Sequence, residues 1–174
     1  TYMAFPFKVD APQVRFEGAN SVIEPTVDQL PGSNTDYYAA HHWADVSDGA
    51  GGVTWAPIDT HMVEFGGLWG GSMSAAHHGA TGPEYGHDWL KPGEITKGHI
   101  YSFIAYNNFR TNFINVRAGD VLSRYAMTSH DGDWQSSNAS AFGWSAANPP
   151  VPVWMNGPKP GTLPTTGSFA SVDG

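Results

Sequence analysis

Histidine is the residue type with the clearest potential for chemistry in this sequence. The chain has eight histidines, and His77, His78 and His87 fall within one glycine-rich stretch that also holds acidic residues. Neutral imidazole binds zinc and copper well. The spacing matches no compact ligand motif, however, and adjacent histidines on a strand, as at His41-His42, point to opposite faces. We therefore expect no cofactor, and the alternative is zinc or copper bound through His77, His78 and His87.

Two pairs of aspartates have the spacing that could place carboxyl groups side by side. They are Asp45 with Asp48 and Asp131 with Asp133. A glycosidase needs two carboxyl groups about 5 to 10 Å apart. In both pairs an aspartate is followed by glycine, which is typical of turns. The chain also has no Gly-x-Ser-x-Gly nucleophile motif, so we assign no catalytic residue.

Aromatic and amide side chains form the candidate carbohydrate-binding set. An aromatic ring can stack on the apolar C–H face of a pyranose, and amide and guanidinium groups can bond to its hydroxyls. The set consists of Trp69, Tyr85, Trp89, Asn107, Asn108, Arg110 and Asn112. The alternatives are core packing for the rings and bonds to nearby backbone for the amides.

Composition and charge exclude several classes of partner. The net charge is −8 and the eight Lys and Arg are scattered, which argues against nucleic acid and anionic membranes. There is no long apolar run to span a bilayer and no cysteine to form disulfides. The first ten residues lack the order of a signal peptide. The compartment stays open, with a secreted or periplasmic location favoured over the cytoplasm.

The pattern of turn-formers and alternating residues predicts an all-β antiparallel sandwich. The chain has 21 glycines, 13 prolines and 13% aromatic residues, which suits many short strands joined by tight loops. We predict hairpins at 14–24 and 37–56, a long loop at 24–36, a strand at 61–65, and central strands at 100–106 and 121–127.

Three further features complete the predicted organisation. A glycine- and histidine-rich loop occupies residues 66–98. A short helix lies near 134–147, capped by Asp133 and ended by Asn148-Pro149. The β-sandwich domain would then cover residues 1–148, and a Pro-rich extended tail, strapped across the sandwich or left loose, would cover 149–174.

Several separated sequence blocks have an order and spacing found in one enzyme family. The blocks are Ala4-Phe5-Pro6-Phe7, Asp28-Gln29-Leu30-Pro31-Gly32-Ser33, Trp43-Ala44-Asp45-Val46-Ser47-Asp48, Gly52-Val53-Thr54, Tyr101-Ser102, Asn107-Asn108-Phe109-Arg110-Thr111-Asn112-Phe113, Arg124-Tyr125, Gly167-Ser168-Phe169 and Ser171-Val172-Asp173. Together they resemble the β-sandwich region of bacterial α-mannosidase-like glycoside hydrolases, family 38. The chain departs from that pattern at its paired histidines and at residues 70–87.

The resemblance implies a fold and a role. It implies a sandwich related to the super-sandwich of large carbohydrate enzymes, with the family's zinc ligands and carboxylate nucleophile in a catalytic domain that this chain lacks. The expected function is therefore non-catalytic: the chain would brace the catalytic domain of the same polypeptide and line its glycan cleft. The alternatives are a freestanding carbohydrate-binding module and a small histidine-dependent metalloenzyme acting on polysaccharide.

Overall fold

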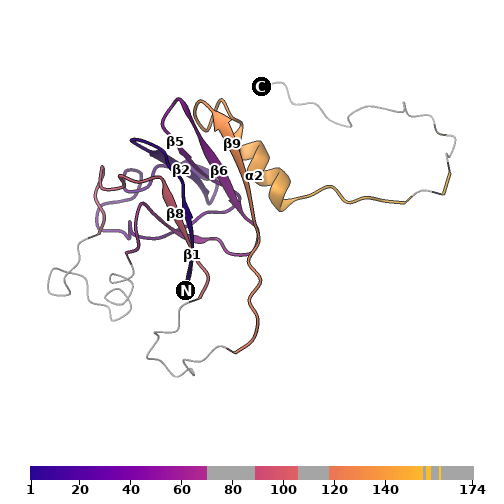
Figure 1. Ribbon diagram of the computed structural model, residues 1–174, viewed down its shortest axis with the longest axis horizontal. Coiled ribbons are helices and arrows are strands. Elements are labelled where there is room, and N and C mark those ends of the chain that lie inside the picture. Colours follow the sequence, from indigo (N-terminus) through magenta and orange to yellow (C-terminus); the bar gives the residue numbers. More distant parts are fainter. Residues whose placement is uncertain (70–88, 106–117, 155, 158–160, 162–174) are drawn as a thin grey trace.

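The computed structural model describes residues 1–69, 89–105, 118–154, 156–157 and 161. These residues form two antiparallel sheets and one helix, which confirms the predicted all-β sandwich (Figure 1). Sheet A contains four strands in the order β1 (Tyr2–Pro6), β8 (His99–Phe103), β7 (Met62–Phe65) and β4 (Tyr38–Ala39). Sheet B contains five, in the order β3 (Ser21–Ile23), β2 (Gln13–Gly18), β5 (Ala44–Ser47), β6 (Gly51–Pro57) and β9 (Tyr125–Asp131).

The predicted hairpin at 14–24 forms in sheet B, and of the one predicted at 37–56 only the part from β5 to β6 forms. Local turn chemistry explains both turns. In the first, β2 pairs with β3 around a turn in which Asn20 has φ 63°. In the second, Asp48 Oδ1 accepts the backbone N–H groups of Ala50 and Gly51 at 3.0 and 3.1 Å, and Gly49 takes φ 85°. Short polar side chains and glycine are the residues that such positive-φ turns require.

The main core lies between the two sheets. Alternate residues of each strand point inward, and large side chains such as Trp55, Phe65 and Ile100 are completely buried. The ring of Phe16 from sheet B meets Tyr38 and Phe65 of sheet A at centroid distances of 5.1 and 5.7 Å. Burial of such rings supplies most of the free energy that holds two sheets together.

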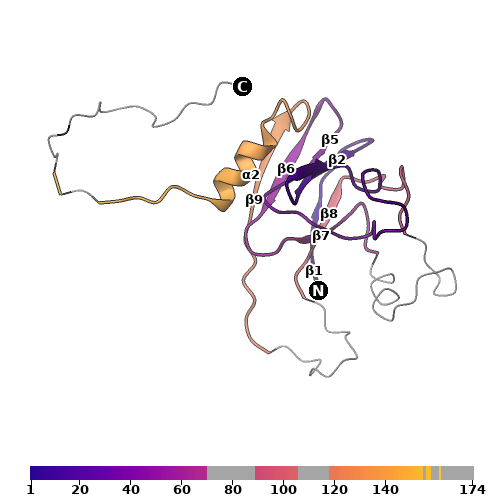
Figure 2. The same cartoon turned by 180° about the vertical axis from the view of Figure 1, so that it is seen from behind.

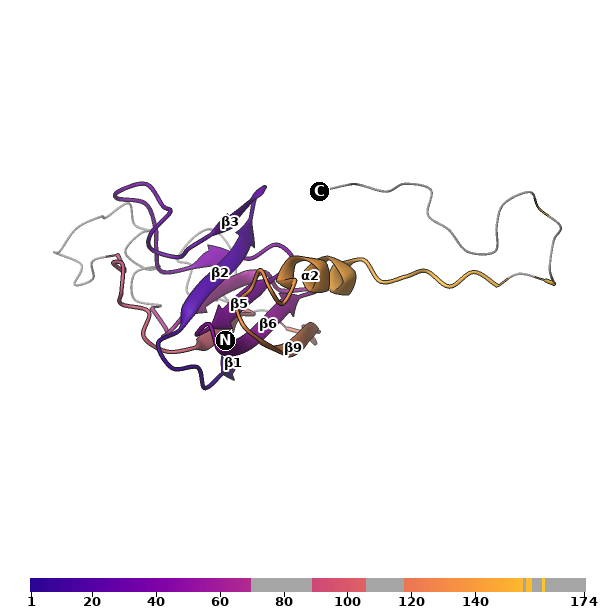
Figure 3. The same ribbon diagram turned by 90° about the horizontal axis from the view of Figure 1, so that it is seen from above.

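A second packing layer covers the other face of sheet B. Trp43 alternates with the core residue Ala44, so it points away from sheet A and stacks on Trp134 at 5.5 Å. The helix α2 (Ala139–Ala147) lies alongside this face, with Gly143 against Trp43 (Figure 3). The strand β5 is therefore buried on both sides, and all four of its residues are buried.

The same outward face of sheet B carries a buried polar cluster. Asp45 is 0% exposed, and its Oδ2 accepts the Thr54 hydroxyl at 2.7 Å. His130 Nε2 lies 2.7 Å from the same oxygen. Hydrogen bonds of this kind offset the cost of burying a carboxylate.

Three predicted strands differ from those observed. The stretch 37–46 is not one arm of a hairpin, because it divides into β4 of sheet A and β5 of sheet B. The strand expected at 121–127 begins only at Tyr125 and is an edge strand, not a central one. The central strand expected at 100–106 is confirmed as β8, although it starts at His99 and ends at Phe103.

The helix and the tail also differ in detail from the prediction. Asp133 does not cap α2; its carboxylate accepts the Ser136 N–H at 2.8 Å and shapes a turn before the helix begins at Ala139. These bonds lower the pKa of Asp133. Residues 149–154 have no regular secondary structure and lead away from the sheets rather than across them (Figure 2). Within the described ranges, no helix is long and apolar enough to cross a membrane.

Candidate functional site

Two of the predicted functional side chains belong to the described part of the chain. They are Trp69 and Trp89. The other predicted sugar-binding residues, Tyr85, Asn107, Asn108, Arg110 and Asn112, lie outside the described residues, as do the candidate metal ligands His77, His78 and His87. Among the residues that are described, no three His, Asp or Glu side chains gather as a metal site would require.

Trp89 lines an open groove between two loops. The groove has a volume of about 410 Å³, within the usual range for small-ligand sites. The described residues around it are Thr26, Gln29, Leu30, Pro31, Gly32, Ser33, Thr35, Trp89, Leu90, Lys91 and Pro92. The lining combines one indole and two prolines with hydroxyl, amide and ammonium groups, so it offers both a ring for stacking and partners for hydrogen bonds.

Buried hydrogen bonds fix the two loops that form the groove. The Tyr38 hydroxyl accepts the Thr26 N–H at 3.1 Å and donates to the Thr35 carbonyl oxygen at 2.6 Å. The Thr35 hydroxyl donates to the Leu90 carbonyl oxygen at 2.6 Å. Burial raises the pKa of Tyr38, so its hydroxyl stays protonated and able to donate. The position of Trp89, one residue before Leu90, is thus set by the protein and not by a ligand.

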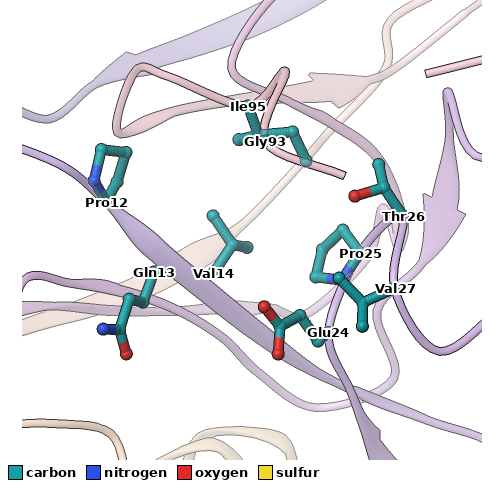
Figure 4. A pocket seen from close by; sticks show the side chains of 9 residues that line it. All are labelled: Pro12, Gln13, Val14, Glu24, Pro25, Thr26, Val27, Gly93 and Ile95. Carbon is teal, nitrogen blue, oxygen red and sulfur yellow. The ribbon is translucent and has the colours of Figure 1, made fainter. Parts of the chain in front are cut away.

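A smaller pocket adjoins the groove and shares Thr26 with it (Figure 4). Its volume is about 130 Å³, and apolar side chains such as Val14, Pro25 and Ile95 form much of its wall. Glu24 supplies a carboxylate, but Arg15 pairs with it at 2.6 Å. This pocket is therefore smaller than the groove beside Trp89, and its one carboxylate already has a partner.

Trp69 has a structural environment instead. Its indole N–H donates to the Phe65 carbonyl oxygen at 3.1 Å, and its ring lies against Gly67. Its backbone N–H donates to the carboxylate of Glu64, which also accepts the Tyr2 hydroxyl. Core-like packing, the alternative weighed for this residue, describes it better than an open stacking surface.

Sequence reasoning missed the carboxylate of Glu64. It lies on the face of sheet A away from the core, yet it is only 1% exposed. Burial raises its pKa, the bonds from Tyr2 and Trp69 oppose that shift, and the charge of Asp36 adds to it. Alternation along β7 predicts a solvated glutamate at this position, so the pattern held no sign of its burial.

Glu64 and Asp36 have parallel roles. Glu64 binds the backbone N–H of Trp69, and Asp36, 0% exposed, binds that of Leu90 at 3.1 Å. Two buried carboxylates thus hold the residues that precede and follow the segment 70–88. Neither side chain is accessible to a substrate, so they do not form a catalytic pair of the glycosidase type.

Comparison with known protein families, with curated proteins and with solved structures finds no match to this chain.

Proposed function

We propose that this chain is the non-catalytic β-sandwich portion of a glycoside hydrolase resembling α-mannosidases, which braces the catalytic domain and contacts the glycan. The observation that carries the glycan contact is the groove of about 410 Å³ beside Trp89. The resemblance of the sequence blocks supplies the enzyme class. One such block, residues 28–33, provides Gln29, Leu30 and Ser33 to the groove wall.

The groove would bind a sugar by stacking and by edge contacts. Trp89 contributes an indole to the lining, and Ser33, Gln29 and Lys91 contribute polar side chains. Stacking of this kind adds about 0.5–1.5 kcal/mol beyond the burial of apolar area. Because hydrogen bonds already hold both walls, little conformational freedom is lost on binding.

Exposed apolar side chains support the bracing part of the proposal. Val121 and Leu122 are adjacent in the chain and are 55% and 74% exposed. Leu30, at the groove, is 81% exposed. Exposed apolar residues that lie together mark surfaces that other domains cover.

The glycan contact is tested with the full chain on an array of mannose-containing and other neutral oligosaccharides. We expect weak but saturable binding, and Trp89→Ala should lower the affinity about tenfold or more, from lost stacking and burial. Trp154→Ala is the matched control, because this tryptophan is 90% exposed and lies outside the groove. Absence of binding to every glycan, or equal affinity of wild type and Trp89→Ala, would overturn the proposed contact.

A freestanding carbohydrate-binding module is the second candidate. It would require only the groove beside Trp89 and no contact with a catalytic domain. A fusion of this chain to the catalytic domain of an α-mannosidase-like enzyme distinguishes the bracing role from the freestanding module. A rise in that domain's thermal stability supports the bracing role, and unchanged stability with retained glycan affinity supports the module.

A further inference from the structure

A half-exposed tryptophan on α2 is held in one orientation by two contacts. The indole of Trp144 stacks on the His42 ring at a centroid distance of 3.9 Å and an interplanar angle of 27°. Its Nε1–H donates to Glu17 Oε1 at 3.1 Å. The other carboxylate oxygen, Oε2, lies 2.9 Å from His42 Nδ1. Glu17 therefore fixes both stacked rings at once.

The backbone beneath these rings is also fixed. Glu17 donates its N–H to the Trp43 carbonyl oxygen at 3.0 Å and accepts the His41 N–H at 2.8 Å. On the helix side, Gly143 is buried against Trp43 and the His42 carbonyl. The indole is thus preorganised, and ordering it costs a ligand little entropy.

Despite these contacts, the ring is far from buried. Trp144 is 48% exposed, whereas Trp43 is 1% and Trp55 0% exposed. One face of the indole stacks on His42 and its N–H is bonded to Glu17, so a ligand that reaches this ring would meet its remaining, apolar part. A rigid indole with open apolar surface is the arrangement that suits stacking.

The surroundings of this ring favour a sugar over a protein partner. The neighbouring exposed residues of α2 and its C-cap are small or polar, among them Ser140, Ser145 and the C-cap residue Asn148. A stable protein interface needs about 800 Å² on each partner with an apolar centre, whereas one pyranose needs only one ring face. The nearby carboxylate of Glu17 and the net charge of −8 disfavour an acidic sugar.

We propose that Trp144, held by Glu17 and His42, is a second stacking site, which takes a neutral pyranose ring of a longer glycan. This inference rests on the proposed glycan-binding function but uses residues separate from the groove beside Trp89. The two sites lie in different parts of the chain: the groove is built from the loops 26–35 and 89–92, and the second site from β2, His42 and α2. A glycan long enough to reach both sites would bind with higher affinity than one that occupies a single site.

The test measures binding of neutral oligosaccharides of increasing length to wild type, Trp144→Ala, Trp89→Ala and Trp154→Ala. We expect Trp144→Ala to weaken binding about three- to tenfold, the range that corresponds to stacking energies. Glu17→Ala should weaken binding as well, because the indole then loses its fixed orientation. Circular dichroism melting of each variant establishes that it is folded at the assay temperature.

Three outcomes are distinct. If wild type binds no oligosaccharide, the proposed function itself fails. If Trp89→Ala loses affinity while folded Trp144→Ala matches Trp154→Ala, the second site is refuted and the groove stands. If Trp144→Ala loses affinity and Trp154→Ala does not, the second site is supported.

Discussion

Replacing Gly143 by alanine tests the packing of α2 on sheet B. A Cβ at this position would lie 2.6 Å from Trp43 Cβ and 2.7 Å from the His42 carbonyl oxygen. The latter is a backbone atom, so the helix itself would have to move. Overpacking costs about 1–3 kcal/mol, and two contacts this short, one of them to a backbone atom, place the cost here at about 2–3 kcal/mol. Alanine recovers about 1 kcal/mol through its better helix propensity. We expect a net loss of about 1–2 kcal/mol in the free energy of unfolding, the difference of these two effects.

Thermal unfolding followed by calorimetry provides the measurement. In a domain of this size 1 kcal/mol corresponds to about 2–4 °C, so the Tm should fall by about 2–8 °C. The control is the pair Ser145→Gly and Ser145→Ala, because Ser145 is exposed on the same helix. At this exposed position, Ser145→Ala should be more stable than Ser145→Gly by about 1 kcal/mol. A Tm for Gly143→Ala equal to or above that of wild type would refute the packing of α2 on Trp43 and His42.

Two further changes test buried groups: the carboxylate of Glu64, which holds Trp69, and the hydroxyl of Tyr38, which positions the groove. Burial raises the pKa of Glu64, so its protonated form is favoured in the folded state, and its contribution to stability falls as the pH rises from its usual range through the raised pKa. The free energy of unfolding of Glu64→Gln, measured by chemical denaturation, should therefore rise relative to that of wild type as the pH increases through this window. A difference between the two proteins that is the same at every pH would contradict this. Tyr38→Phe leaves the Thr26 N–H and the Thr35 carbonyl without their bond to the hydroxyl and should cost about 1–3 kcal/mol. The same variant should weaken glycan binding, and an unchanged denaturation midpoint would argue against the buried bonds.

Much of sheet B could be predicted because its signals are local. The turns at Asn20 and at Asp48-Gly49 are readable from residue type, so the two hairpins followed from the sequence. Strand β1 was not predicted as a strand. It pairs with β8, about a hundred residues away, and such a partner leaves no local signal. The start of β9 was misplaced because Val121 and Leu122 are as apolar as a strand but are exposed.

The candidate site was predictable only in part. Trp89 was identified as a candidate because an aromatic side chain in a long polar loop is expected either to pack against the domain or to bind a ligand. The structure shows that Trp89 lines a groove. Trp144 was hidden inside a predicted helix, where a tryptophan suggests packing. Its orientation depends on Glu17 and His42, which lie more than a hundred residues earlier in the chain. Distant contacts of this kind cannot be inferred from spacing along the sequence.

The buried aspartate of β5 has a consequence for how the strands find their partners during refolding. Because β5 is covered on both faces, alternation of apolar residues does little to distinguish its native register from one shifted by a single residue. A shifted register would turn Asp45 toward the core and away from Thr54 and His130. Leaving a buried polar group without its hydrogen bonds costs about 1–3 kcal/mol, and more for a charged group. We therefore expect the Asp45 carboxylate to disfavour sheets in which β5 pairs in a shifted register. Replacing Asp45 by an apolar residue should allow such misaligned forms to be populated, even if the replacement stabilises the correctly aligned sheet.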